Sequence, residues 1–191
     1  PMAIIFALTR QSELPVLRWM SGLLIDTTRS FPLLTILFTA AVILPFVLPQ
    51  WLQGDKLYRV IFAFAVFFGA YQAEIIRGGL QSIPHGQADA AKALGLGYWQ
   101  RTWLITLPQA FRNTLPATIN QFVITFKETS IVIIIGFFEV LASGNAAYGS
   151  GKWTETYVEV YVFIAAIYFL FVFSLSRYGA FLENRMRVGH D

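Results

Sequence analysis

The chain has 191 residues, 56% of them hydrophobic and only 13% charged, about half the charged fraction of a typical soluble domain. This composition excludes an ordinary soluble protein and indicates an integral membrane protein. The net charge of +3 is small, and no cluster of basic residues indicates nucleic-acid binding. The absence of cysteine excludes thiolate metal sites, and His85 and His190 are too far apart in the sequence to suggest another metal centre.

Residues 1–8 are apolar but far fewer than the roughly 20 that a spanning helix needs. They also lack the basic start and the small-residue cleavage site of a signal peptide. We therefore interpret them as the end of a first membrane helix, and expect the chain to be N-terminally truncated. Residues 9–32 form a polar connector, predicted to contain a helix partly at the membrane interface and partly against the bundle.

Two apolar segments follow, residues 33–49 and 57–74, and each is predicted to cross the membrane. Pro45 is expected to kink the first, because proline lacks the N–H that bonds to the preceding turn. A short interfacial turn joins the two spans. At the end of the second span, Glu74 and Arg77 lie three residues apart on one helical face, which predicts an ion pair with either a structural or a gating role.

Residues 82–108 are polar and helix-prone, which predicts a helical hairpin at the membrane surface. Ser82 and Pro84 are suited to begin its first helix, by hydroxyl capping and by a proline in the first turn. Gly95 and Gly97 are expected to end that helix, because glycine accepts the left-handed conformation at a helix C-terminus. A second short helix is predicted to follow and to end at the Leu-Pro pair that closes the segment.

The spacing of small and apolar residues in this hairpin resembles the EAA loop of ABC importer permeases, with Asp in place of the usual first Glu. The matching residues are Asp89, Ala90, Ala91, Gly95, Ile105, Leu107 and Pro108. The neighbouring segments Glu74 to Gln87 and Phe126 to Ser130 resemble the polar amino-acid subfamily of these permeases, and the similarity covers nearly the whole chain.

This resemblance implies an all-α, type I (MetI-like) ABC importer fold, with residues 1–191 forming a single permease domain. It also implies that the seven matching residues dock into a cytoplasmic ATPase, with Asp89 contacting a basic residue there. No cofactor would be bound by this chain, since ATP and Mg²⁺ belong to the partner ATPase. The other implied partners are a second permease subunit, identical or different, an extracytoplasmic amino-acid-binding protein, membrane lipid and a polar L-amino acid.

Residues 111–135 are predicted to span the membrane although they include the charged pair Lys127 and Glu128. An ionisable group at mid-bilayer costs about 2.5–3.5 kcal/mol on insertion scales, so such residues usually line a pathway or form pairs. Adjacent residues point about 100° apart on a helix and do not simply neutralise each other. We predict that Glu128, Thr129 and Ser130 face the translocation path, with Glu128 engaging the substrate amino group. The alternative is that both charges make interhelical pairs that hold the bundle.

Residues 136–144 are predicted to form a short re-entrant or interfacial helix, residues 144–153 a glycine-rich loop, and residues 157–175 the last span. Basic residues concentrate on the side of the hairpin and the C-terminus, which predicts that both are cytoplasmic in a multi-pass protein. Those on this side are Arg10, Arg18, Arg29, Arg77, Lys92, Arg101, Arg112, Arg177, Arg185 and Arg187, against Lys56, Arg59 and Lys152 on the other. The resemblance implies that the membrane is the bacterial inner membrane.

The resemblance therefore implies the permease subunit of an ABC importer for polar L-amino acids, and the composition and the predicted spans agree with it. We do not expect an enzyme, because no catalytic constellation is visible. The alternative is a secondary transporter or channel driven by an ion gradient, in which internal repeats are common. No convincing repeat is present in the sequence, and a docking hairpin would have no purpose in such a protein.

Overall fold

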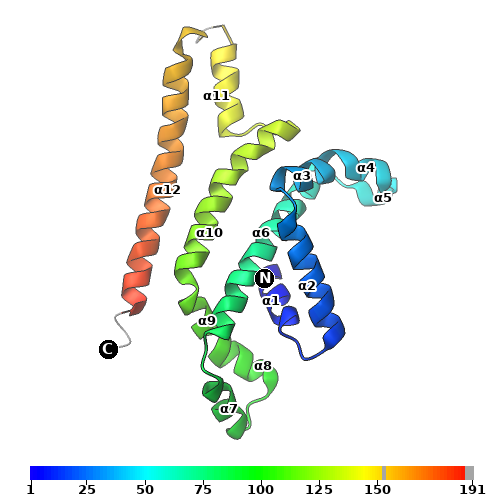
Figure 1. Ribbon diagram of the computed structural model, residues 1–191. Coiled ribbons are helices and arrows are strands. Elements are labelled where there is room, and N and C mark those ends of the chain that lie inside the picture. The colour runs from blue at the N-terminus through cyan, green and yellow to red at the C-terminus, as the bar shows by residue number, and fades with distance from the viewer. Residues whose placement is uncertain (152–153, 188–191) are drawn as a thin grey trace. The chain divides into compact units, whose positions relative to one another are not determined.

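The computed structural model describes residues 1–151 and 154–187, and the regular secondary structure of this range is helical (Figure 1). The α-helices are α1 (Met2–Arg10), α2 (Pro15–Ser30), α3 (Leu33–Phe38), α4 (Leu44–Val47), α5 (Gln50–Gln53), α6 (Lys56–Gln81), α7 (His85–Ala93), α8 (Tyr98–Arg101), α9 (Leu107–Asn113), α10 (Leu115–Glu128), α11 (Val140–Gly149) and α12 (Tyr157–Arg187). Two π-helical stretches, η1 (Thr39–Ile43) and η2 (Thr102–Thr106), and two 3₁₀ helices, η3 (Thr129–Ile135) and η4 (Thr154–Thr156), join some of them. Lys152, Trp153 and His190, which entered the sequence predictions, lie outside the described residues.

Three of the described helices are long and apolar enough to cross a membrane: residues 56–81, 115–135 and 157–186. Residues 15–30 and 33–47 meet the same criterion only when they are counted together as one broken span. The large side chains that remain exposed on α12 are mostly apolar, as expected of a helix that faces lipid.

The chain divides into two compact units, and the first comprises residues 1–31, 65–121 and 179–191. In this unit α1 and α2 pack beside α6 (Figure 1). The buried cluster at its centre combines small and branched residues from α1, α2, α6 and α9, each at most 2% exposed: Ala7, Ile25, Ala70, Ala73, Ile76 and Leu107. At Gly79 a Cβ atom would lie 2.6 Å from the Ala110 carbonyl oxygen, so glycine is needed for α6 to approach α9 this closely.

The second unit comprises residues 32–64 and 122–178. In this unit the side chain of Arg59 donates hydrogen bonds to the irregular backbone of η1. In η1 the Leu44 N–H donates to the Thr39 carbonyl, five residues back, and Pro45 has no N–H to give. The carbonyls of Ala40 and Ala41 therefore lose their helical donors. Arg59 replaces them, because its Nε donates to Ala40 O at 2.9 Å and its Nη2 to Ala41 O at 3.3 Å.

The guanidinium of Arg59 has two further acceptors, the carbonyls of Gln53 and Gly54, each at 2.7 Å from Nη1. Close by in sequence, Lys56 Nζ donates to the Ile135 carbonyl at the end of η3 and lies 5.3 Å from the centroid of the Phe137 ring. The two basic residues at the start of α6 thus satisfy backbone carbonyls at the ends or breaks of other helices.

Several predicted boundaries are wrong, and each error has a local cause. The helix that carries the predicted second span, α6, does not end near residue 74 but continues to Gln81. Ser82 does not cap α7, because its hydroxyl donates to the Gly79 carbonyl at 2.8 Å, and Pro84 occupies the capping position. Gly97 begins α8 rather than ending α7, and its N–H donates to the Gln100 side chain at 3.1 Å.

Two further corrections concern a proline and a glycine-rich segment. Pro108 does not end the second hairpin helix: η2 ends just before Leu107, and α9 continues through the proline to Asn113. Residues 144–149 are helical rather than a loop, because they belong to α11, which packs on α12. A Cβ atom at Gly144 would lie 2.1 Å from Ile164 Cδ1, so this glycine serves helix packing.

Candidate functional site

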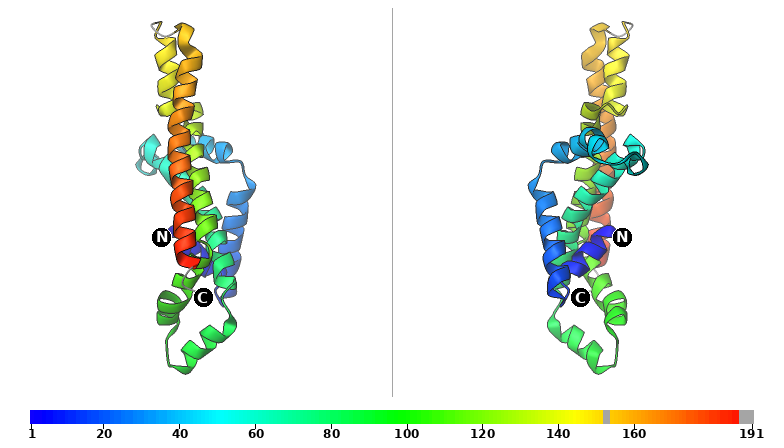
Figure 2. Two further views of the ribbon diagram at one scale, coloured as in Figure 1. Left: turned by 90° about the vertical axis from the view of Figure 1, so that its left-hand side faces the viewer. Right: turned by 90° about the vertical axis from the view of Figure 1, so that its right-hand side faces the viewer.

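The hairpin that follows α6 consists of α7, α8, η2 and α9, and Figure 2 shows it at the end of α6. Side chains tie its two arms together. Gln109 Nε2 donates to Gln87 Oε1 at 2.5 Å, and Asn113 Nδ2 donates to Ser82 Oγ at 2.8 Å. The hairpin is therefore a folded element with defined faces.

Gly95 ends α7 in the left-handed conformation, with φ +77°, as the sequence predicted. Its N–H donates to Lys92 O at 2.9 Å, and the Leu96 N–H donates to Ala91 O at 3.1 Å, which together form a Schellman motif. The role of Gly95 inside this chain is thus to turn the backbone between α7 and α8.

The seven residues of the motif divide into an exposed group and a buried group. Ala91 and Leu107 are 2% and 1% exposed, and Leu107 belongs to the central cluster of the first unit. Ile105 is partly buried. The other four are exposed, and these are Asp89, Ala90, Gly95 and Pro108. A partner protein can therefore touch the four exposed residues. The two buried residues, Ala91 and Leu107, instead pack inside the unit and support the shape of the hairpin.

The hairpin also exposes large apolar side chains that sequence reasoning missed. Leu94 is 81% exposed, Trp99 63% and Leu104 69%. Exposed side chains of this kind on a polar segment indicate a contact surface for protein or membrane. The signal in the sequence was the presence of tryptophan and leucine in a helix too short to bury them.

Glu74 lies at the centre of an arginine cluster in the first unit. Its Oε2 atom is 2.8 Å from Arg77 Nη2 and 3.6 Å from Arg29 Nη1, and its Oε1 atom is 3.1 Å from Arg10 Nη1. Arg10 also pairs with Asp26 at 2.9 Å. The expected pair of Glu74 and Arg77 is present, but two arginines from the connector, which sequence reasoning did not bring here, complete it. The cluster joins α1 and α2 to α6.

The predicted path residues mark a change of helix type in the second unit. The α-helix α10 ends at Glu128, and the backbone continues as the 3₁₀ helix η3. Thr129 Oγ1 donates to Phe126 O at 2.7 Å and Ser130 Oγ to Lys127 O at 2.9 Å, so both hydroxyls bind carbonyls at the break. Lys127 is exposed and Glu128 is half-buried. Among the residues that the structure describes, neither charge forms an ion pair, so the alternative of structural pairing finds no contact here.

Two further polar residues near this break were not singled out from the sequence. Glu139 caps α11, accepting from the N–H groups of Leu141 and Ala142 at 2.8 Å each. The Tyr168 hydroxyl donates to Glu139 Oε2 at 3.4 Å and also lies near the hydroxyls of Thr129 and Ser130. A tyrosine in a segment otherwise rich in phenylalanine was the available signal.

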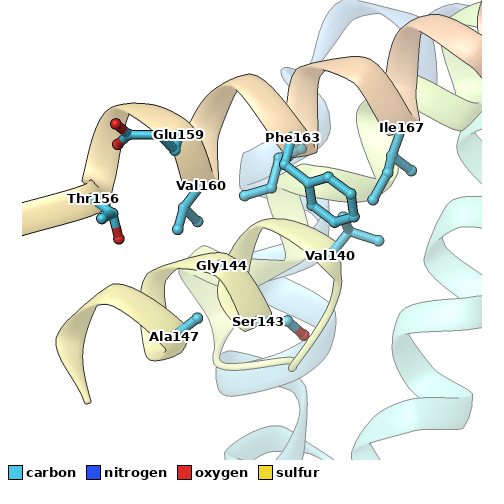
Figure 3. Close-up of a pocket in the computed structure, with 10 residues that line it drawn as sticks. Val140, Ser143, Gly144, Ala147, Thr156, Glu159, Val160, Phe163 and Ile167 are labelled. Atoms are coloured by element: carbon cyan, nitrogen blue, oxygen red, sulfur yellow. The ribbon is translucent and has the colours of Figure 1, made fainter. Parts of the chain in front are cut away.

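A cavity of about 730 Å³ lies between α11 and α12 in the second unit. Val160, Phe163 and Ile167 of α12 point toward α11, while the Glu159 carboxylate points away from it (Figure 3). An apolar lining of this kind does not offer the paired donors and acceptors that an amino-acid head group needs. Among the described residues, no group of three His, Asp or Glu side chains could hold a metal ion.

Comparison with known proteins gives a consistent result. Residues 1–188 match the family described as "Binding-protein-dependent transport system inner membrane component". The chain is 42% identical over 99% of its length to the inner membrane amino-acid ABC transporter permease protein YhdY of Escherichia coli (strain K12). It is 41% identical over its whole length to the glutamate/glutamine/aspartate/asparagine transport system permease protein BztC of Rhodobacter capsulatus.

These alignments cover 52% and 44% of the two relatives, so the chain spans about half their length. Among solved structures, an amino acid ABC transporter crystallised with histidines contains a similar chain. The TM-score is 0.80 at 31% identity, and the match covers 96% of this chain and 83% of that one. This similarity confirms the expected all-α permease fold.

Proposed function

Because the chain belongs to the family of binding-protein-dependent transport system inner membrane components, we propose that it contributes to the translocation path of an ABC importer for polar L-amino acids. Family membership also confirms that it is a permease component rather than an enzyme. The printed names of its relatives, which include amino-acid and glutamate transport permeases, support the proposed substrate class. The observation that carries the proposal is the folded hairpin, whose exposed motif residues are available to another protein.

The hairpin docks into a separate cytoplasmic ATPase, which binds ATP and Mg²⁺. The exposed residues Asp89, Ala90 and Gly95 form the contact, and Asp89 pairs with a basic residue of the ATPase. Closure of the ATPase dimer moves the hairpin. Leu107 transmits this movement, because its buried side chain lies in one cluster with residues of α6. Such coupling requires that the hairpin bind the two ATPase states with different geometry.

The remaining assembly follows from the same family. A second permease subunit, identical or similar, completes the path, and an extracytoplasmic binding protein delivers the amino acid. The hairpin and the C-terminus face the cytoplasm of a bacterial inner membrane, in agreement with the distribution of basic residues.

Ala90 gives a cleaner test of docking than Gly95. Any side chain at Gly95 strains a backbone with positive φ, whereas Ala90 is exposed and helical. We expect Ala90→Leu to insert normally, to lose co-purification with the ATPase, and to lower ATP-driven uptake at least about tenfold, since a badly fitting contact costs roughly 1–3 kcal/mol. Ala90→Ser, which stays small, should keep both activities. Full uptake by Ala90→Leu would contradict docking at this face.

Substrate contact is assigned to the helix break. Glu128 engages the amino group of the amino acid, with Lys127, Thr129 and Ser130 beside it on the path. The unpaired state of both charges within the described residues supports this assignment. Glu128→Gln should reduce uptake of cationic amino acids more than that of neutral ones. Unchanged uptake of both classes would remove Glu128 from the path and leave the docking proposal intact.

Glu74 and Arg77 are assigned a structural role rather than a gating one. Glu74 contacts three arginines from α1, α2 and α6, and an anchored group of this kind holds the helices that lead into the hairpin. Removing this shared carboxylate leaves Arg29 and Arg77 without an ion-pair partner among the described residues, and Arg10 with Asp26 alone. Glu74→Gln should therefore lower stability and uptake of all substrates together.

A further inference from the structure

A basic groove of about 500 Å³ opens between α1, α2 and the end of α6, in the first unit. Its lining includes three arginines, Arg10, Arg18 and Arg77, and the one carboxylate of Asp26. Two of these arginines share a carboxylate outside the lining, because Glu74 binds Arg10 through Oε1 and Arg77 through Oε2, and Arg29 also lies 3.6 Å from Oε2. The groove and its immediate neighbours thus hold four guanidinium groups against two carboxylates.

Arg18 is the guanidinium in this set for which the described residues supply no ion-pair partner. Arg10 is committed to Asp26 and Glu74, and Arg77 to Glu74. Within residues 1–151 and 154–187, no carboxylate lies within ion-pair distance of the Arg18 side chain. A guanidinium beside a cavity, with its counter-charge missing, suits an anion that brings two oxygens to one planar fork.

The apolar rim of the groove identifies the anion as part of a lipid. Trp19 and Leu23 line the groove and are 68% and 54% exposed. The groove ends at Gln81, the last residue of the membrane-length helix α6, and so lies where a span meets the head-group layer. Tryptophan is enriched at this depth, and basic pockets between membrane helices on the cytoplasmic side bind acidic head groups. A soluble anion would gain nothing from the exposed indole and leucine.

We propose that this groove binds one acidic phospholipid of the cytoplasmic leaflet, with its phosphate on Arg18 and its acyl chains along Trp19 and Leu23. The lipid fastens α2 to the end of α6, beside the point where the hairpin begins. The proposal rests on the cytoplasmic orientation assigned above but does not depend on the identity of the transported substrate.

Gly22 provides a second way to test the site, because it lines the groove and a Cβ atom there meets nothing within 4 Å. Gly22→Leu fills the space without removing a charge and introduces a better helix former. Gly22→Ala adds a single methyl group and serves as its control. For the charge, Arg18→Gln is matched by Arg185→Gln, an exposed basic residue on the same proposed side of the membrane but outside the groove.

The experiment measures lipid retention on the purified transporter complex by native mass spectrometry, with phosphatidylglycerol, phosphatidylcholine and inorganic phosphate as separate probes. We expect one phosphatidylglycerol to be retained in preference to phosphatidylcholine. Arg18→Gln should weaken that binding about fivefold, as expected for one basic residue at an anionic surface, and Gly22→Leu should also lower occupancy. Gly22→Ala and Arg185→Gln should bind as the parent does.

Three results would overturn the proposal. If Arg18→Gln and Gly22→Leu both retained as much phosphatidylglycerol as the parent protein, the lipid would bind elsewhere. Displacement of the lipid by inorganic phosphate at equal concentration would show a site for a free anion. If another chain of the complex covers the groove, no retained lipid will depend on Arg18 or Gly22, and the proposal fails. Uptake assays on Ala90→Leu remain separate, so failure here leaves the docking proposal untouched.

Discussion

The stretches η1 and η2 break the α-helical hydrogen-bond pattern in the same way but satisfy the freed carbonyls differently. Each starts at a threonine and is followed by Leu-Pro, and in each the leucine N–H donates to that threonine carbonyl, five residues back. A proline that lacks an N–H then leaves the carbonyl four residues before it without a donor. The sequence motif and the backbone defect are therefore shared.

At η1 a protein side chain makes good the loss, because Arg59 donates to the carbonyls of Ala40 and Ala41. At η2 the corresponding carbonyls belong to Trp103 and Leu104, which are 54% and 69% exposed. In the described part of the chain, no side chain donates to either of them. Lipid offers no hydrogen bonds whereas water does. We therefore propose that η1 lies within a membrane span, where its carbonyls need an internal donor, and that the hairpin with η2 faces water, which supplies one.

The largest effect that this comparison predicts is for Arg59→Met. The substitution leaves two carbonyls of η1 without a donor, and each buried orphan costs about 1–3 kcal/mol, so we expect a loss of roughly 2–6 kcal/mol in the free energy of unfolding. Denaturant unfolding of the protein in lipid–detergent micelles measures it. Arg59→Lys keeps the charge but loses the planar guanidinium, so its free energy of unfolding should lie between those of the parent and Arg59→Met. A variant as stable as the parent would show that η1 obtains its donors from elsewhere.

A smaller and more specific effect is expected when Pro45→Ala is added to Arg59→Met. The alanine restores an N–H that can bond to the Ala41 carbonyl, so the double variant should recover about 1 kcal/mol of the lost stability. Pro45→Ala alone should change stability little, because Arg59 already satisfies that carbonyl. The coupling energy from this double-mutant cycle isolates the link between proline and arginine. If the stability changes of the two single variants simply added up in the double variant, Pro45 and Arg59 would act independently.

The smallest effect is predicted for Pro108→Ala, the counterpart of Pro45→Ala in the hairpin. Leu104 is 69% exposed, so we expect water to bond to its carbonyl and the free energy of unfolding to change by no more than about 0.5 kcal/mol. The measurement is the same unfolding curve, taken alongside the η1 variants. If Pro108→Ala shifted stability as strongly as Arg59→Met does, the distinction between the two environments would be lost.

Local features of the fold were predictable from the sequence because their causes are local. Gly95 takes the left-handed conformation that its place after a helix suggested, and Glu74 pairs with Arg77 one turn away. The helix break at Thr129 coincides with two hydroxyls that bind the carbonyls three residues back. Short-range geometry is enough for each of these.

Features that depend on distant partners were not predictable in this way. The donor for the η1 carbonyls comes from Arg59, 19 residues beyond Ala40, and the second arginine on Glu74 comes from α1. Pro108 was expected to end a helix, because the sequence does not show that a π-helical stretch precedes it and lets the helix continue. Likewise, the contrast between exposed Ala90 and buried Ala91 is set by which face of α7 meets the rest of the hairpin.

We propose above all that the hairpin of this chain docks into a separate ATPase subunit, whose ATP hydrolysis drives transport. Reconstitution of the tagged chain with its co-purified partners into proteoliposomes, followed by amino-acid uptake and substrate-stimulated ATP hydrolysis, tests it most directly. The account predicts that uptake requires the ATPase subunit and ATP, and that Ala90→Leu uncouples the two. Transport at full rate without any nucleotide-hydrolysing partner would contradict it.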